Sequence, residues 1–270
     1  SLKEGLTVFR DQSFTSDLHS AAVKRIEDVA MLRNTQFRED AGPTAHPVKP
    51  AEYQAIDNFY TTTIYEKGAE VIRMLHTLLG PERFMRGMEV YVSRFDGMAA
   101  TTEDFVQAIV DGASSDGQPL TFDPNRFQRW YHQAGTPELS VEREWDSVRG
   151  VMTLTLHQST SPTPGQVEKQ PLVLPIAMAL VDDKGRIGEE QLVVMDQAEQ
   201  SVTLQGHPGS EPPALSLLRR FSAPVTVRLE QSLEECLQLL AADDDAFSRW
   251  DAGQRLSRQI LLARSKGSVD

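Results

Sequence analysis

The period of the hydrophobic pattern changes twice along this chain of 270 residues. Apolar residues first recur at the spacing of an amphipathic helix, as in Leu2, Leu6 and Phe9. After Pro137 they alternate with polar residues, which is typical of a strand with one buried face, and from Ser232 the helical spacing returns. Because helices and strands bury apolar residues at different periods, no single bundle or sheet fits the whole chain. The pattern predicts three successive units, helical, strand-rich and helical again: residues 1–136, 137–229 and 230–270.

The middle unit has the features of an antiparallel β-sandwich. Met152, Leu154 and Leu156 alternate with polar residues, and residues 172–181 form an apolar run that ends in a turn-like Asp-Asp-Lys-Gly sequence. Further short apolar segments follow, separated by glycine and proline, at residues 192–195, 201–204 and 225–229. Since no long helical stripe interrupts them, two antiparallel sheets packed face to face are the simplest arrangement.

Helix start signals mark both helical units. Thr101 lies three residues before Asp104, and Ser232 lies three residues before Glu235, so each pair can form a capping box. The last unit has apolar stripes in two successive helices, and two helices cannot bury both stripes alone. We therefore expect an array of helices that continues beyond Asp270.

Charge and composition exclude several classes of function. The chain has 27 Lys and Arg against 39 Asp and Glu, and the net charge of −12 disfavours nucleic acid and anionic membranes as partners. It has no apolar stretch near 18 residues and no signal-like start. A single cysteine, Cys236, excludes an internal disulfide and a thiolate metal site, which fits a reducing compartment. We expect a cytoplasmic protein that binds neither nucleic acid nor a membrane.

Two carboxylates share a face of the first expected helix. Glu4 and Asp11 are seven residues apart, so they project together from the side opposite the apolar stripe. This arrangement fits an ordinary solvated face, because paired carboxylates are common on helix surfaces. It also fits a carboxylate that faces a cleft, with the second one orienting a neighbouring ligand. The spacing alone does not separate the two interpretations.

A tyrosine lies at the expected N-terminus of another helix. Three threonines at positions 61–63, followed by Ile64, disfavour a helix there, whereas a clean apolar stripe begins at Ala69. Tyr65 therefore falls at a helix N-terminus, where its phenol could donate a hydrogen bond to an anion. The alternative is a packing tyrosine whose hydroxyl is in water.

Four segments together resemble a known family. Residues 1–12 (SLKEGLTVFRDQ) and 60–70 (YTTTIYEKGAE) closely resemble the aminopeptidase N family of zinc metallopeptidases in its bacterial form, and Ala45–Pro47 and Phe247–Asp251 are also similar to it. The resemblance covers essentially the whole chain. It implies the all-α lobe of a thermolysin-like catalytic domain, then an antiparallel β-sandwich, then the first helices of a C-terminal helical domain.

The resemblance also implies roles for five residues. Glu4 looks like the carboxylate that completes the zinc site, and Lys3 is its neighbour lining the cleft. Asp11 looks like the acid that orients a zinc-bound imidazole. Tyr65 is similar to the tyrosine that stabilises the tetrahedral intermediate, and Tyr60 to one that lines the substrate site. A catalytic zinc has three protein ligands and one water, and the oxyanion formed in the reaction needs a positioned hydrogen-bond donor, the role that the resemblance gives to Tyr65.

The residues that are absent limit what this chain can do alone. The family's His-Glu-x-x-His helix, which supplies two zinc ligands and the general base, does not occur in the sequence. None of the six histidines, at positions 19, 46, 76, 132, 157 and 207, forms an i, i+4 pair that could replace it. We interpret His46 and His76 as structural or exposed.

These observations predict a fragment of a zinc-dependent aminopeptidase that removes N-terminal residues from peptides. The missing upstream and downstream segments of the same protein would be its partners. Alone, the chain is expected to bind zinc poorly or not at all and to be inactive. The alternative is a non-catalytic protein-interaction module built on the β-sandwich and the helical lobe. A zinc-ligand helix encoded upstream of Ser1 would favour the aminopeptidase fragment over the interaction module.

Overall fold

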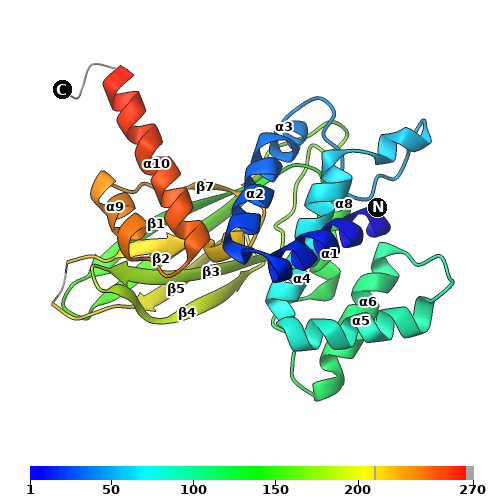
Figure 1. Cartoon of the computed structure of the whole chain (residues 1–270), viewed down its shortest axis with the longest axis horizontal. Helices are drawn as coiled ribbons and strands as arrows, with labels where there is room; N and C mark the ends of the chain where they lie inside the picture. Colours follow the sequence, from blue (N-terminus) through cyan, green and yellow to red (C-terminus); the bar gives the residue numbers. More distant parts are fainter. Residues whose placement is uncertain (210, 266–270) are drawn as a thin grey trace.

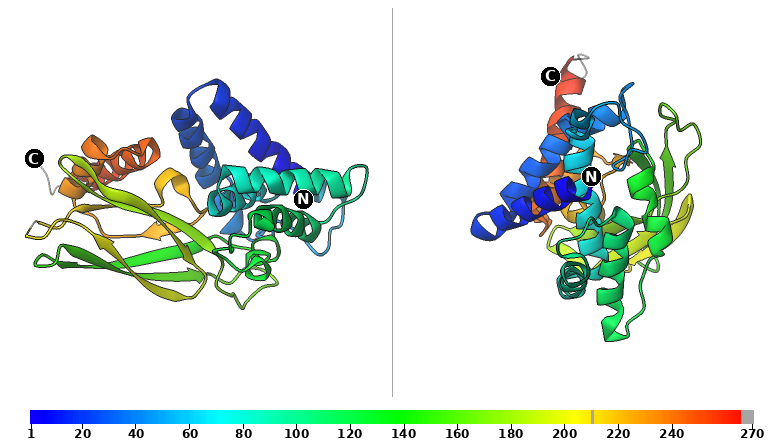
Figure 2. Two further views of the ribbon diagram at one scale, coloured as in Figure 1. Left: turned by 90° about the horizontal axis from the view of Figure 1, so that it is seen from below. Right: turned by 90° about the vertical axis from the view of Figure 1, so that its right-hand side faces the viewer.

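The computed structural model describes residues 1–209 and 211–265 and has three parts in chain order (Figure 1, Figure 2). A helical lobe comes first, a β-sandwich of two sheets follows, and two helices pack on the sandwich. This order confirms the predicted fold class. Residues 266–270 of the predicted third unit lie outside the described residues.

The helical lobe is organised around α4 (Gly68–Leu79), in which nine of twelve residues are buried. A helix that is apolar on nearly all sides has to be covered by neighbours on nearly all sides. Figure 1 shows α1 (Leu2–Leu18) crossing α4. The other elements of the lobe are α2 (Ala21–Asn34), α3 (Gln36–Asp40), η1 (Ile56–Phe59), η2 (Thr63–Lys67), α5 (Pro81–Phe95), α6 (Thr102–Ala113), η3 (Ser114–Asp116), α7 (Pro124–Phe127) and α8 (Arg129–His132).

The lobe and the sandwich share one hydrophobic core. Leu75 of α4, Phe127 of α7 and Leu174 of the sandwich belong to the same buried cluster. The indole Nε1 of the fully buried Trp130 donates a hydrogen bond to the carbonyl of Val173 at 2.8 Å. A contiguous core of this kind fixes the lobe against the sandwich.

The sandwich contains one four-stranded and one three-stranded sheet, with strand orders β5-β2-β1-β7 and β4-β3-β6. The pairings are antiparallel, as predicted, except that of β1 with β7, which is parallel and lies at one edge of the four-stranded sheet. The strands are β1 (Pro137–Asp146), β2 (Val151–Thr160), β3 (Leu174–Asp182), β4 (Gly185–Met195), β5 (Glu199–Gln205), β6 (Ala214–Leu217) and β7 (Thr226–Arg228).

Two strands show how burial follows from the sequence pattern. In β2 the residues Met152, Leu154 and Leu156 are buried and those between them are not, as the alternation predicts. In β3 eight of nine residues are buried, because one face packs inside the sandwich and the other is covered by α4 and α9. The continuous apolar run therefore reflects a strand that is covered on both faces.

The C-terminal helices α9 (Leu233–Ala242) and α10 (Ala246–Ser265) lie against the three-stranded sheet (Figure 2). The capping box of Ser232 is present as predicted. The buried residues of α9 are Cys236 and Leu239, whereas Leu237 is 51% exposed, so the predicted stripe is only partly covered. Within residues 1–209 and 211–265 no helix, α10 included, is both long and apolar enough to cross a membrane.

The turn η4 (Arg219–Phe221) has unusual backbone geometry. Leu218, Arg220 and Phe221 all have positive φ, between 53° and 54°, which is costly for residues with a side chain. The guanidinium of Arg25 in α2 holds this turn, since it donates to the carbonyls of Arg220 and Phe221 at 2.9 Å each. The same guanidinium makes two hydrogen bonds of 2.6 Å with Glu70 of α4, so the turn is tied to the helical lobe.

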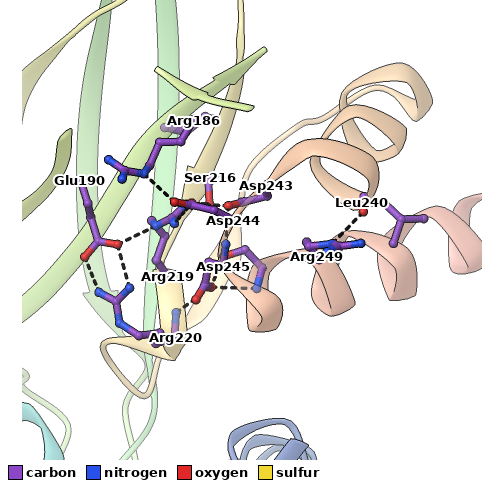
Figure 3. A network of polar contacts seen from close by, with 12 residues as sticks. Arg186, Glu190, Ser216, Arg219, Arg220, Leu240, Asp243, Asp244, Asp245 and Arg249 are labelled. Carbon is purple, nitrogen blue, oxygen red and sulfur yellow. Dashed lines mark hydrogen bonds and ion pairs between the residues drawn. The ribbon is translucent and has the colours of Figure 1, made fainter. Parts of the chain in front are cut away.

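Arg219 is the centre of a second network at this turn (Figure 3). Its side chain is only 3% exposed and bonds to Asp243 at 2.6 Å, to Glu190 at 2.7 Å and to Asp244. Asp243 and Asp244 belong to the link between α9 and α10, and Glu190 to β4. Arg219 therefore joins the sandwich to the C-terminal helices.

Candidate active site

A pair of glycines lets the two helices that carry the predicted site residues approach closely. A Cβ atom on Gly5 would lie 2.7 Å from the carbonyl carbon of Gly68, and a Cβ on Gly68 would lie 3.2 Å from the Cα of Gly5. Only glycine fits where two backbones come this near. Gly5 directly follows Glu4, and Gly68 comes three residues after Tyr65, so the crossing sets the relative position of the two side chains.

We expect Gly5→Ala to destabilise the chain by about 1–3 kcal/mol, because the added methyl group meets backbone that cannot move aside without separating α1 from α4. Urea denaturation would measure the change. Gly253→Ala is a matched control in α10, where the nearest atom to an added Cβ is a Leu240 methyl at 3.4 Å. A Gly5→Ala chain as stable as the control would show that the close crossing is not required.

Glu4 is a largely buried carboxylate in the first turn of α1. Its side chain is 12% exposed, and the Lys3 amine lies 3.3 Å from one of its oxygens. Burial acts to raise the pKa of Glu4, whereas a hydrogen bond from its own backbone and the Lys3 amine act to lower it. A cation ligand has to be ionised, and the neighbouring Lys3 amine favours that form of Glu4.

Tyr65 and Tyr60 lie beside one another at the entry to α4. Their rings are stacked with centroids 6.3 Å apart, Tyr60 being 66% exposed and Tyr65 half-buried. Glu4 is the main group that raises the pKa of Lys3, and Tyr65 and Tyr60 are close enough to contribute. The structure thus brings together Lys3, Glu4, Tyr60 and Tyr65, which the sequence places about sixty residues apart in two pairs.

The backbone around Tyr65 differs from the prediction. The sequence favours an N-terminus at this point, but Tyr65 lies inside the π-helical turn η2, which runs directly into α4. The expected absence of helix over the threonines is wrong from Thr62 onward. Contacts from α3, described below, hold a turn that local propensity disfavours.

Asp11 is not part of this group. It lies two turns further along α1 with an exposed side chain. Its charge is the last of those that raise the pKa of Glu66, after burial and the charges of Asp28 and Glu70. The predicted role of Asp11 in orienting a metal ligand stays a prediction.

The side chains present do not by themselves form a zinc site. Glu4 offers one carboxylate, and within residues 1–209 and 211–265 no three His, Cys, Asp or Glu side chains are grouped closely enough to hold a metal ion. His46 bridges the Thr44 carbonyl at 2.7 Å and the Thr61 hydroxyl at 2.9 Å. His76 packs against Phe9 and Phe84, and burial followed by the charge of Arg73 lowers its pKa.

Sequence reasoning missed the polar residues that support the site. Lys67 and Glu70 are 1% and 3% exposed, and they pair with Asp40 and Arg25 from other helices. Charged residues inside the apolar stretch at the start of α4 are a signal that could have identified buried pairs. Their partners could not be identified, because Asp40 and Arg25 look like ordinary surface charges in the sequence.

The fold and this group of side chains are similar to those of the M1 peptidase family. Residues 1–123 match the family described as "Peptidase family M1 domain". Residues 135–230 match a domain of unknown function with an Ig-like fold, and residues 233–269 match its C-terminal companion, described as ARM repeats.

Named relatives make the assignment more specific. The chain is 46% identical to Aminopeptidase N of Haemophilus influenzae and 48% identical to Aminopeptidase N of Caulobacter vibrioides, over 97% and 100% of its length. The crystal structure of Legionella pneumophila aminopeptidase A in complex with aspartic acid is similar over 94% of this chain and 27% of that chain, with a TM-score of 0.74 and 28% identity. The chain therefore belongs to the aminopeptidase N family, and it spans about 30% of the length of the two relatives.

Proposed function

We propose that this chain is the part of a zinc-dependent aminopeptidase that supplies one metal ligand, Glu4, and one transition-state donor, Tyr65. The observation that carries the proposal is the Gly5–Gly68 crossing, which fixes the first turn of α1 against the turn that holds Tyr65. The similarity to aminopeptidases over nearly the whole chain supports it. The remaining ligands would come from parts of the protein that this chain does not include.

The proposed roles follow from the chemistry of each side chain. Zinc, when bound, would polarise the peptide carbonyl and lower the pKa of a water molecule. Glu4 contributes a negative charge and an oxygen donor. The phenol of Tyr65 donates a hydrogen bond to the oxygen on which negative charge develops, and Lys3 and Tyr60 line the space where the peptide lies. A cytoplasmic location also stays a proposal, supported by the free and buried Cys236.

Assay of the whole protein tests this proposal against the non-catalytic alternative. We expect release of N-terminal residues from short peptides, loss of the activity on chelation, and recovery when zinc is added back. A whole protein that releases no N-terminal residue at any zinc concentration would contradict the proposal and favour the interaction module.

The isolated 270-residue chain is expected to bind zinc weakly and to hydrolyse no peptide. One carboxylate is too few ligands, since a catalytic zinc usually has three from the protein. Titration calorimetry with zinc would measure this, with Glu4→Gln as the matched variant. A tight one-to-one site that disappears in Glu4→Gln would show that the chain completes a metal site on its own.

A further inference from the structure

The turn that carries Tyr65 has a conformation that needs support from outside. η2 (Thr63–Lys67) is a π-helix, a form that is rare and seldom stable on local interactions alone. The β-branched Thr61, Thr62 and Thr63 make it less favourable still. A π-turn holds one residue more than an α-turn, so its collapse to α-helix would rotate the preceding side chains by about 100° around the axis. The direction of Tyr65 therefore depends on whatever holds this turn.

Glu39 holds the N-terminal end of the turn. Its Oε1 atom accepts hydrogen bonds from the backbone N–H of Thr63 at 2.8 Å and from the Thr63 hydroxyl at 2.5 Å. The Thr63 hydroxyl also accepts a hydrogen bond from the buried Gln36 at 3.2 Å. A carboxylate on a free N–H group at a helix start is a strong, charge-assisted contact.

Asp40 holds the C-terminal end. Its Oδ2 lies 2.8 Å from the amine of Lys67, and both side chains are 1% exposed. The Thr136 hydroxyl donates to the same oxygen at 2.9 Å, and Lys67 also donates to the carbonyl of Gly135 at 2.9 Å. Burial acts to raise the pKa of Asp40, but the charge of Lys67 and hydrogen bonds from Lys67, Gln36 and Thr136 together outweigh burial, so the pKa is lowered and the pair is ionic.

Both contacts come from adjacent residues of one short helix, α3, and Tyr65 lies between the two points that they hold. We propose that Glu39 and Asp40 are positioning residues, which keep η2 in the π conformation and so direct the phenol of Tyr65 toward the reacting carbonyl. This inference rests on the proposed function of Tyr65. If it holds, α3 influences kcat although it touches neither metal nor substrate in the proposed site.

Kinetics of the whole enzyme test the proposal, with Glu39 changed alone and together with Tyr65. Glu39→Ala is expected to lower kcat by about 10- to 100-fold with little change in KM, because the phenol is misdirected. Glu39→Gln keeps an acceptor oxygen and should recover most of the loss. In a Tyr65→Phe background Glu39→Ala should cost nothing more, because there is no hydroxyl left to misplace.

The matched control is Glu103→Ala, which removes a carboxylate of the same lobe that pairs with Lys49 at 2.7 Å and should leave kcat unchanged. Amide hydrogen exchange gives a readout apart from activity, and Glu39→Ala should speed exchange over residues 63–67 more than elsewhere. If Glu39→Ala does not fold, kcat and amide exchange are measured on Glu39→Gln instead, for which smaller changes in the same directions are expected.

The outcomes separate this inference from the function on which it rests. An equal loss from Glu39→Ala in both backgrounds, or unchanged exchange over residues 63–67, would overturn the positioning role and leave Tyr65 in place. An unchanged kcat for Tyr65→Phe by itself would overturn the proposed function, and the positioning role with it.

Discussion

Replacing Tyr65 with Phe is expected to lower the kcat of the whole enzyme by about 10²–10³-fold while KM changes little. The phenol donates to an oxygen whose negative charge is large only in the transition state, so its loss should raise the barrier without weakening substrate binding. The ring, its stacking on Tyr60 and the packing of η2 remain in the variant. Steady-state kinetics with a dipeptide substrate measure both constants.

Tyr91→Phe is the matched control for this prediction. Tyr91 lies in α5 of the same lobe, its ring packs on Phe95 and Phe105, and it belongs to no part of the proposed site. It should leave kcat unchanged. If Tyr65→Phe is as active as Tyr91→Phe, or if it raises KM alone, Tyr65 is not the transition-state donor.

The second large effect is expected at Arg219. Arg219→Met should destabilise the chain by about 3–5 kcal/mol, because Asp243, whose side chain is fully buried, loses the cation that neutralises it. Such a loss is a large fraction of a typical stability of about 5–15 kcal/mol. Since Asp243 begins the link between α9 and α10, these helices should lose amide protection first. Denaturant unfolding and amide exchange together measure the effect.

Arg186→Met is the control for Arg219. Arg186 pairs with Asp244 at 2.8 Å, but Asp244 is half-exposed, and surface pairs contribute about 0–1 kcal/mol. The double variant Arg219→Met/Asp243→Leu should recover much of the stability, since it removes the buried charge together with its partner. A loss for Arg219→Met no larger than for Arg186→Met would show that the network does not hold the C-terminal helices.

The fold class could be predicted because it depends on local periodicity. Alternation in β2, the apolar run in β3 and the capping box at Ser232 each reflect interactions within a few residues. The parallel pairing of β1 with β7 could not be predicted, because Glu138 and Thr226 meet across almost ninety residues of chain. Nothing near either strand specifies the direction of such a partner.

The site could be predicted only in part, for a similar reason. Spacing gave Glu4 and Tyr65 as possibilities, and the resemblance to a family gave them roles. The spacing did not indicate the π-turn, because that turn depends on Glu39 and Asp40, more than twenty residues earlier in the chain. The threonines that precede Tyr65 predict the wrong local structure, since tertiary contacts decide it.

We propose that Glu4 and Tyr65 act on one substrate carbonyl in a zinc aminopeptidase. The most direct measurement is a crystal structure of the whole protein with a phosphinic peptide analogue, recorded at the zinc absorption edge. We expect a Glu4 oxygen about 2.0–2.2 Å from zinc and the Tyr65 hydroxyl about 2.7–3.1 Å from a phosphinic oxygen. A zinc ion bound without Glu4, or a Tyr65 phenol beyond hydrogen-bond reach of the analogue, would contradict the claim.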